Sequence, residues 1–189
     1  MSKELPIQTY GAPVLRETAR PVEAVTPELR KLARDMILTM HHANGVGLAA
    51  QQVGRTEAVC VIDVPAEYDV EEKGGPRLNP DVKMPLVMFN PRITAASEDE
   101  TSSQDEGCLS FPGINGSVER PWRIRVAYLD IDGNAREIGL QGYFARAAQH
   151  EIDHLNGTLF IDRFKYVKKL AVRGKLKRLK EETLAGGAE

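Results

Sequence analysis

Two histidines and a glutamate lie within six consecutive residues, Gln149-His150-Glu151-Ile152-Asp153-His154. On an α-helix, positions i and i+4 lie on one face, one turn apart, so both imidazoles can reach the same metal ion. The glutamate between them can reach a water bound to that metal without being a ligand itself. This is the H-E-x-x-H arrangement of metal-dependent hydrolases, in which the glutamate acts as general base.

Two histidines do not complete a catalytic metal site, which usually has three protein ligands and one open position. No histidine follows His154, so the candidates for a third ligand lie upstream: Cys108, His41 and His42. Cys108 is favoured because it lies in a short turn, away from the periodicity of a strand, and because a thiolate binds zinc, iron or nickel well.

The residues around the two histidines predict the helix that their spacing requires. The run from Tyr143 to Leu155 is mostly apolar and rich in alanine, and Asn156-Gly157 is typical of a helix end. The alternative is a buried helix whose histidines are only hydrogen-bonded. We disfavour it because a carboxylate and two histidines are costly to bury without a function.

The composition fits one globular domain with a substantial core. Of 189 residues, 42% are hydrophobic and 28% are charged, with a net charge of −2, so no global preference for nucleic acid or anionic membrane follows. No apolar run reaches the ~18 residues that span a bilayer, and the N-terminus lacks the apolar region of a secretory signal. Two cysteines are too few for a disulfide framework, so we expect a cytoplasmic protein.

Periodicity and turn residues predict both helices and strands. Thr26-Pro27-Glu28 is typical of a helix start, and this helix is expected to end near Ala43. Strands are predicted at 57–64, with Cys60 in the core, at 86–89, and as a hairpin at 122–130 and 135–141. Residues 65–83 and 95–105 are polar and are expected to form surface loops.

A small-residue segment, Gly45 to Gly54, contains Gly45-Val46-Gly47 and the single polar amide Gln52 among small and apolar neighbours. Glycines here allow unusual backbone or the close approach of a ligand. Taken alone, the segment is more typical of a structural turn. It is not the dinucleotide-binding pattern, since a helix and not a strand precedes it.

Three segments together resemble peptide deformylases: Gly45-Val46-Gly47-Leu48-Ala49-Ala50-Gln51-Gln52, Glu106-Gly107-Cys108-Leu109-Ser110, and the histidine segment 149–154. They occur in that family's order. The similarity extends from about residue 11 to 162 and is weak at 65–83 and 94–105. The basic C-terminal segment resembles that of the bacterial type I branch.

The resemblance implies an α+β fold with antiparallel β-sheets packed around the metal-binding helix. It implies a catalytic domain at 1–163, followed by a basic helix and frayed tail at 164–189. The enzyme would remove the formyl group from the N-terminal formyl-methionine of new polypeptides. Cys108, His150 and His154 would bind one divalent metal, Fe²⁺ in this family, replaceable by Ni²⁺, Co²⁺ or, less actively, Zn²⁺.

The same resemblance assigns roles to further residues. Glu151 would move protons, while the Gln52 side chain and the Leu109 backbone N–H would stabilise the oxyanion. Gly45-Val46-Gly47 would lie beside the substrate peptide as in strand addition. The methionine side chain would enter an apolar pocket near Val46, Leu109 and the helix before His150.

Four charged residues near the motifs have open interpretations. Arg146 lies one turn before His150. Either its head group reaches solvent at the pocket rim, which we favour, or the pocket accommodates a polar feature, and we expect an effect on peptide preference. Glu106, Asp153 and Arg120 either support the metal ligands by hydrogen bonds or form a surface salt bridge.

The C-terminal segment carries nine lysines and arginines and no acidic residue between Arg163 and Lys180. Helical spacing is expected to place four apolar residues on one side, against the body: Leu170, Val172, Leu176 and Leu179. The basic face is either merely solvated or, as we favour from the resemblance, docks on ribosomal RNA. A monomer that uses formyl-Met nascent peptides, without a membrane partner, is expected.

Two other functions fit the histidine motif. One is a zinc peptidase that cuts internal peptide bonds, which the Glu-Gly-Cys-Leu-Ser segment and the lack of a downstream ligand disfavour. The other is a non-catalytic metal-binding or ribosome-associated module. The sequence shows no loss of the ligand, base or amide positions that would favour this module.

Overall fold

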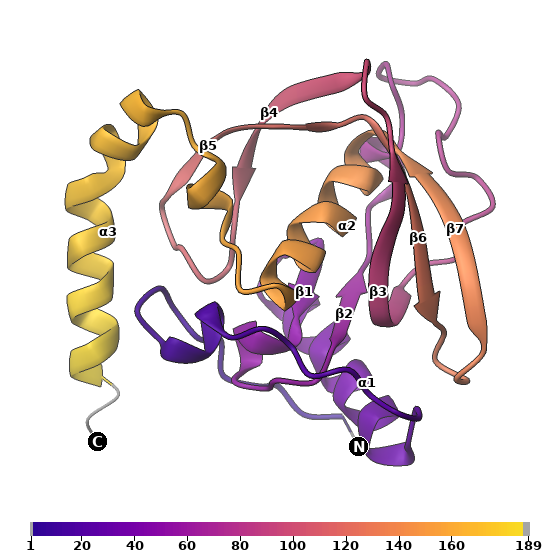
Figure 1. Ribbon diagram of the computed structural model, residues 1–189, viewed down its shortest axis with the longest axis horizontal. Coiled ribbons are helices and arrows are strands. Elements are labelled where there is room, and N and C mark those ends of the chain that lie inside the picture. The colour runs from indigo at the N-terminus through magenta and orange to yellow at the C-terminus, as the bar shows by residue number, and fades with distance from the viewer. Residues whose placement is uncertain (1, 187–189) are drawn as a thin grey trace.

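The computed structural model describes residues 2–186, which form helices and strands of both kinds (Figure 1). The α-helices and strands occur in this order: α1 (Pro27–His42), β1 (Gly47–Ala49), β2 (Val59–Ile62), β3 (Leu86–Ala96), β4 (Thr101–Gly107), β5 (Asn115–Pro121), β6 (Arg123–Leu129), β7 (Ala135–Gln141), α2 (Gly142–Leu155) and α3 (Tyr166–Gly186). The described residues also form four short 3-10 helices, of which the first precedes α1 and the others connect the later elements: η1 (Pro13–Arg16), η2 (Ala50–Val53), η3 (Ala66–Tyr68) and η4 (Phe160–Arg163). No helix within residues 2–186 is long and apolar enough to cross a membrane.

The strands form two separate sheets. Five of them pair in the order β1-β2-β3-β6-β7, and β4 pairs with β5 alone. Every pairing is antiparallel. The predicted hairpin is confirmed, with β6 and β7 in register from Arg123 opposite Gln141 to Leu129 opposite Ala135. The α+β class with antiparallel sheets is therefore confirmed.

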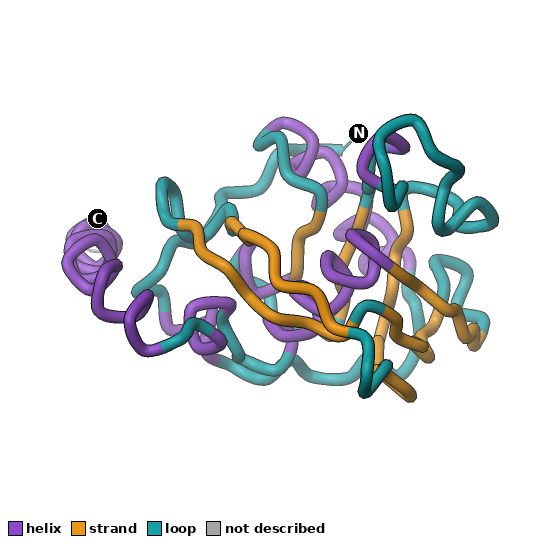
Figure 2. The backbone as a smooth tube through the Cα atoms, turned by 90° about the horizontal axis from the view of Figure 1, so that it is seen from above, coloured by secondary structure: helices purple, strands orange, loops and turns teal. Residues whose placement is uncertain are grey.

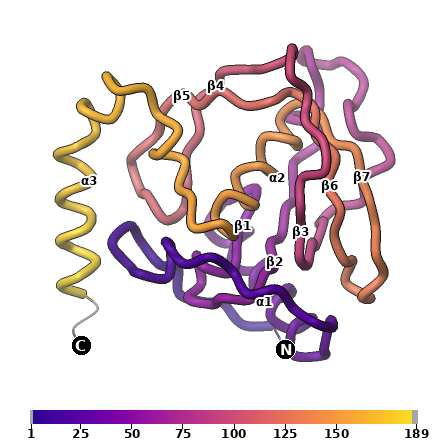
Figure 3. The backbone as a smooth tube through the Cα atoms, in the orientation of Figure 1, coloured from indigo at the N-terminus to yellow at the C-terminus, as the bar shows by residue number. Residues whose placement is uncertain are grey.

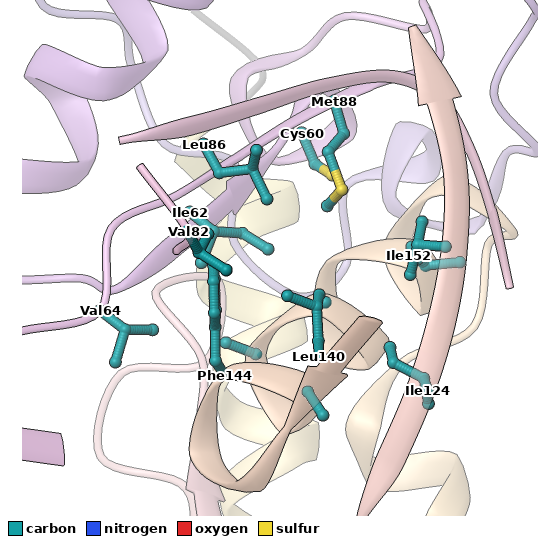
Figure 4. Close-up of a cluster of buried hydrophobic side chains, with 14 of the residues drawn as sticks. Cys60, Ile62, Val64, Val82, Leu86, Met88, Ile124, Leu140, Phe144 and Ile152 are labelled. Carbon is teal, nitrogen blue, oxygen red and sulfur yellow. The ribbon is translucent and has the colours of Figure 1, made fainter. Parts of the chain in front are cut away.

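Helix α2 lies between the five-stranded sheet and the β4–β5 pair (Figures 1 and 2). One side of it packs on the sheet through Phe144, Ala148 and Ile152. These residues meet Cys60 and Ile62 of β2 in the core cluster drawn in Figure 4. Burial raises the pKa of Cys60 well above its usual value, so its thiolate is disfavoured and the residue is structural, as predicted.

Helix α1 covers the opposite face of the sheet. Side chains alternate between faces along a strand, and Val59 and Val61 of β2 accordingly join a second core cluster with Met36 and Met40 of α1. The predicted start of this helix is confirmed, because the Thr26 hydroxyl accepts a hydrogen bond from the Leu29 N–H at 3.4 Å.

Helix α3 lies at one end of the molecule, beyond the β4–β5 pair (Figure 3). Val172, Leu176 and Leu179 pack onto a third cluster that contains Phe111 and Phe160. The prediction for Leu170 was wrong: it is 51% exposed, because the contact face of α3 follows the spacing 172, 176 and 179. Of the expected frayed tail, 187–189 lie outside the described residues, and 185–186 complete the last turn of α3.

The prediction of a loop at 95–105 was wrong, since only residues 97–100 connect β3 to β4. Most side chains of β4 are exposed, so its sequence shows no apolar alternation. The strand predicted at 86–89 also continues to Ala96. A register shift between Phe89 and Arg92 accommodates Asn90, whose φ is 49°, and the following proline. The loop at 65–83 is confirmed apart from η3.

Candidate metal centre

Helix α2 presents His150, Glu151 and His154 in the interior of the protein. Their exposed fractions are 8%, 4% and 1%. The two imidazole rings lie one helical turn apart, with their centroids separated by 5.0 Å. The helix ends as predicted, with Gly157 in the left-handed conformation at φ 66°. The sequence spacing thus brings the two imidazoles close enough to bind the same metal ion.

Cys108 completes the group from the turn that follows β4. Its Sγ lies 3.3 Å from Nε2 of His154. One ligand atom from each of Cys108, His150 and His154 lies within 4.8 Å of the others, and this is the one such group found in residues 2–186. The alternative candidates lie on the surface, where His41 pairs with Asp63 and His42 with Glu4.

The donor set fits a divalent transition metal, since thiolate and imidazole are its usual protein ligands. Burial lowers the pKa of His154 well below its usual value and keeps that imidazole neutral, as a ligand must be. Burial opposes the charge on His150 too, but hydrogen bonds with Cys108 and Glu106 outweigh it and raise that pKa. Binding of a metal would displace the proton that lies between the His150 imidazole and the Cys108 thiol, because both groups bind metals in their deprotonated forms.

A buried carboxylate orients His150. Its Nδ1 lies 2.9 Å from Oε2 of Glu106, which leaves Nε2 to face the candidate metal position. Burial would raise the pKa of Glu106, but hydrogen bonds from Arg120 and His150 hold it well below the usual value. Arg120, Glu106 and Asp153 are 2%, 6% and 8% exposed. The surface salt bridge considered above is therefore excluded.

The expectation for Arg146 was wrong. Its head group does not reach solvent, as the residue is only 4% exposed. Its guanidinium donates to Oε1 of Glu106 at 2.6 Å, to the Val118 carbonyl at 2.8 Å and to the Ser102 carbonyl at 2.6 Å. These partners come from β4 and β5, whose pairing the sequence did not reveal. Arg146 is a buried cation that contributes to the cavity lining, so the expected solvent-exposed position is wrong, and its effect on peptide preference stays a prediction.

Glu151 lies against the backbone of β1. A Cβ built at Gly47 would overlap Oε1 of Glu151, so only glycine leaves room for this carboxylate in its present position. Oε2 is buried and has no hydrogen-bond partner in the described part of the chain. Burial raises the pKa of Glu151 to about 7, against the opposing effect of His150. Such a carboxylate can exchange protons near neutral pH.

Gln52 has a fixed orientation beside the three candidate ligands. Its Oε1 accepts a hydrogen bond from the Ala49 N–H at 2.8 Å. The amide NH₂ therefore points the other way, 3.4 Å from both Sγ of Cys108 and Oγ of Ser110. Sequence reasoning found Gln52 but not Ala49, because a backbone donor leaves no trace in residue type.

A cavity of about 540 Å³ is lined by Gln52, Cys108, His150 and Glu151. Gly45, Val46 and Gly47 line one side of it, and the backbone around Cys108 and Leu109 lines another. The α2 wall adds Tyr143 and Ala147, which the sequence analysis did not single out. They lie seven and three residues before His150, so the helical period could have indicated them.

Comparison with known proteins gives a consistent result. A family model described as Polypeptide deformylase matches residues 4–170, which include every candidate site residue. The chain is 43% identical over 183 residues to a peptide deformylase from Opitutus terrae, covering 96% of this chain and 95% of that protein. A crystal structure of peptide deformylase from Ehrlichia chaffeensis is similar, with a TM-score of 0.82, 40% identity and coverage of 96% and 99%. A structure of peptide deformylase from the same organism in complex with actinonin is similar too, with a TM-score of 0.79 and 40% identity. The match covers 94% of this chain and 98% of that one.

The contact between Gly47 and Glu151 predicts the effect of one methyl group. Gly47→Ala should displace the Glu151 carboxylate and lower kcat of hydrolysis at least tenfold, within the roughly 10²–10⁴-fold contribution of a general base. The thermal unfolding midpoint and the metal content should change little, because the displaced atoms lie toward the end of a flexible side chain.

Gly139→Ala provides the matched control, since a Cβ built there meets nothing within 4 Å. Steady-state kinetics and thermal unfolding of both variants test the prediction. An unchanged kcat in Gly47→Ala would show that the position of Glu151 does not matter for turnover.

Proposed function

Because the chain belongs to the peptide deformylase family, we propose that Cys108, His150 and His154 hold the divalent metal ion on which the family's hydrolysis depends. Enzymes of this family remove the N-terminal formyl group from newly synthesised polypeptides, and the chain is a hydrolase of this kind. We propose Fe²⁺ as the resident metal, with Ni²⁺, Co²⁺ or Zn²⁺ as substitutes, since a thiolate and two imidazoles suit all four.

The proton transfers are assigned to Glu151. A bound divalent ion would polarise the formyl carbonyl and lower the pKa of a water molecule at the site. Glu151 accepts the proton of the attacking water and later gives it to the departing amine. Two observations support this role: the carboxylate is adjacent to a ligand in the sequence, and its Oε2 has no partner among residues 2–186.

Two hydrogen-bond donors are proposed to stabilise the negative charge that develops on the formyl oxygen. The Gln52 amide is held by the Ala49 N–H so that its NH₂ faces the site. The backbone N–H of Leu109 follows the Cys108 ligand directly and lies in the cavity wall. Donors that are fixed before the reaction stabilise such charge without reorganising.

The substrate peptide is proposed to lie along Gly45-Val46-Gly47. Strand β1 is at the edge of the sheet and pairs only with β2, so its other edge can accept an added strand. The Val46 carbonyl already accepts the Asp63 N–H at 2.9 Å, so the peptide bonds to other backbone groups of this segment. The methionine side chain enters the cavity between Val46, Leu109 and the Tyr143–Ala147 wall.

One observation carries the proposal: the Cys108 thiol, the His150 imidazole, a buried carboxylate and an oriented amide line one cavity, and the His154 imidazole lies against that thiol. The direct test uses formyl-Met-Ala-Ser and anaerobically purified protein reconstituted with Fe²⁺ or Ni²⁺. The wild type should release formate rapidly, and Glu151→Ala should lose roughly 10²–10⁴-fold in kcat while still binding metal. The base is lost in this variant, whereas all three ligands remain.

Acetyl-Met-Ala-Ser serves as the substrate control, and cleavage of a longer peptide that is blocked at both ends tests for an internal peptidase. Neither should be hydrolysed at a comparable rate. Equal formate release by Glu151→Ala and wild type would contradict the role of Glu151. Metal binding without formate release would favour the non-catalytic module.

The cellular setting is also a proposal. We propose that the chain works in the cytoplasm as a monomer, with residues 1–163 as the catalytic unit and 164–189 as a docking element for the ribosome. Nine lysines and arginines without an acidic residue lie between 163 and 180, and most of them are exposed. Such a cluster can bind the phosphates of ribosomal RNA with an affinity that falls as salt rises.

The docking test must keep the core of α3 intact, because Val172, Leu176 and Leu179 cover apolar residues. Three exposed basic residues are changed to glutamine together: Arg173, Lys177 and Arg178. Cosedimentation with ribosomes at low salt should fall about tenfold or more, since several phosphate contacts are lost. Turnover on a free peptide should not change.

The control variant removes three exposed arginines of the β6–β7 hairpin: Arg123, Arg125 and Arg136. It should cosediment as the wild type does. If both triple variants bind ribosomes equally well, the basic face of α3 is only a solvated surface.

A further inference from the structure

A continuous set of buried ionic contacts runs from His150 to the segment that precedes α3. The His150 imidazole is held by Glu106, and Glu106 accepts two hydrogen bonds from Arg120, at 2.6 and 2.9 Å. The same guanidinium donates from Nη1 to Oδ2 of Asp153 at 2.8 Å. Arg120 therefore joins the carboxylate behind the candidate ligand to a second carboxylate on α2.

Asp153 is in turn held by Arg163, the last residue of η4. Arg163 donates from Nε to Oδ2 and from Nη2 to Oδ1 of Asp153, both at 2.6 Å. This two-point contact fixes the plane of the carboxylate. Only two residues separate Arg163 from the first residue of α3, Tyr166. The set of contacts thus reaches from the candidate metal centre to the start of the basic helix.

The charges in this set depend on one another. Two carboxylates, Glu106 and Asp153, are shared among three arginines, Arg120, Arg146 and Arg163. If Arg163 is removed, Arg120 is the remaining cation in contact with Asp153 among these residues. Since one guanidinium cannot approach both carboxylates more closely at once, a shift toward Asp153 weakens its two bonds to Glu106. Glu106 then holds His150 less firmly.

We propose that Arg163 is a positioning residue of the metal centre, acting on His150 through Asp153, Arg120 and Glu106. The side chain of Arg163 is 42% exposed, so it is reachable from the surface, unlike Arg120. Movement at the start of α3 is transmitted by these contacts to a metal ligand. This inference rests on the metal site proposed above.

The test compares Arg163→Ala with Arg163→Lys in protein loaded anaerobically with Co²⁺. Four quantities are measured: the rate of metal loss to a chelator, the visible absorption of the Co²⁺ site, and both kcat and KM on formyl-Met-Ala-Ser. Partners of metal ligands typically contribute 10–100-fold to metal affinity or activity, so for this more distant residue we expect about tenfold faster metal loss in Arg163→Ala. The Co²⁺ spectrum should shift, and kcat should fall with KM unchanged.

Arg163→Lys keeps the charge and one hydrogen bond, so it should restore most of the slow metal loss. Arg16→Ala is the matched control: Arg16 makes a similar two-point contact, at 2.5 and 3.0 Å, with Asp162 of the same short helix, but that pair has no link to Glu106. It should leave the metal-loss rate and the Co²⁺ spectrum as in the wild type.

Two results would overturn the inference. One is wild-type metal loss and an unshifted spectrum in Arg163→Ala. The other is an equal effect in Arg163→Ala and Arg16→Ala without rescue by lysine, which would indicate a general loss of stability. Failure of the wild type itself to bind Co²⁺ would instead overturn the metal site, and the proposed link with it.

Discussion

Glu106 keeps its negative charge in a place where only 6% of the residue is exposed, because Arg120, Arg146 and His150 all contact it. An isolated charge at such depth would be neutralised or would unfold its surroundings. Removal of one partner from a buried pair costs about 3–5 kcal/mol. Arg120 on β5 and Arg146 on α2 can therefore be buried here only while Glu106 is ionised. The same carboxylate orients His150.

Helix α2 can carry this chemistry because its two sides differ. Phe144, Ala148 and Ile152, spaced by four, pack on the five-stranded sheet. Arg146, His150 and His154 have the same spacing but lie two residues further along, and Arg146 and His150 hydrogen-bond with residues of the β4–β5 pair. The short second sheet thus supplies polar partners that a purely apolar layer could not. It also holds Cys108 in the turn at its end.

The local parts of this arrangement could be predicted from the sequence. The H-E-x-x-H spacing places three side chains by helical geometry alone, and the hairpin at 122–141 follows from alternation and a turn. The predictions that were wrong concern residues whose position depends on partners distant in the chain. The exposed strand β4 has no apolar alternation, so its pairing with β5 was missed, and with it the partners that bury Arg146. Leu170 was wrongly predicted to be buried, because the side of α3 that packs on the body is the one that contacts the cluster of Phe111 and Phe160.

The three proposed ligands are tested most directly by X-ray absorption spectroscopy of the Zn²⁺-loaded protein. The account predicts one sulfur at about 2.3 Å and two imidazole nitrogens at about 2.0–2.1 Å, with the sulfur lost in Cys108→Ser. The second cysteine, Cys60, is fully buried in the core and should not contribute. A spectrum without sulfur, or one that Cys108→Ser leaves unchanged, would contradict the assignment of Cys108, His150 and His154 as the metal centre.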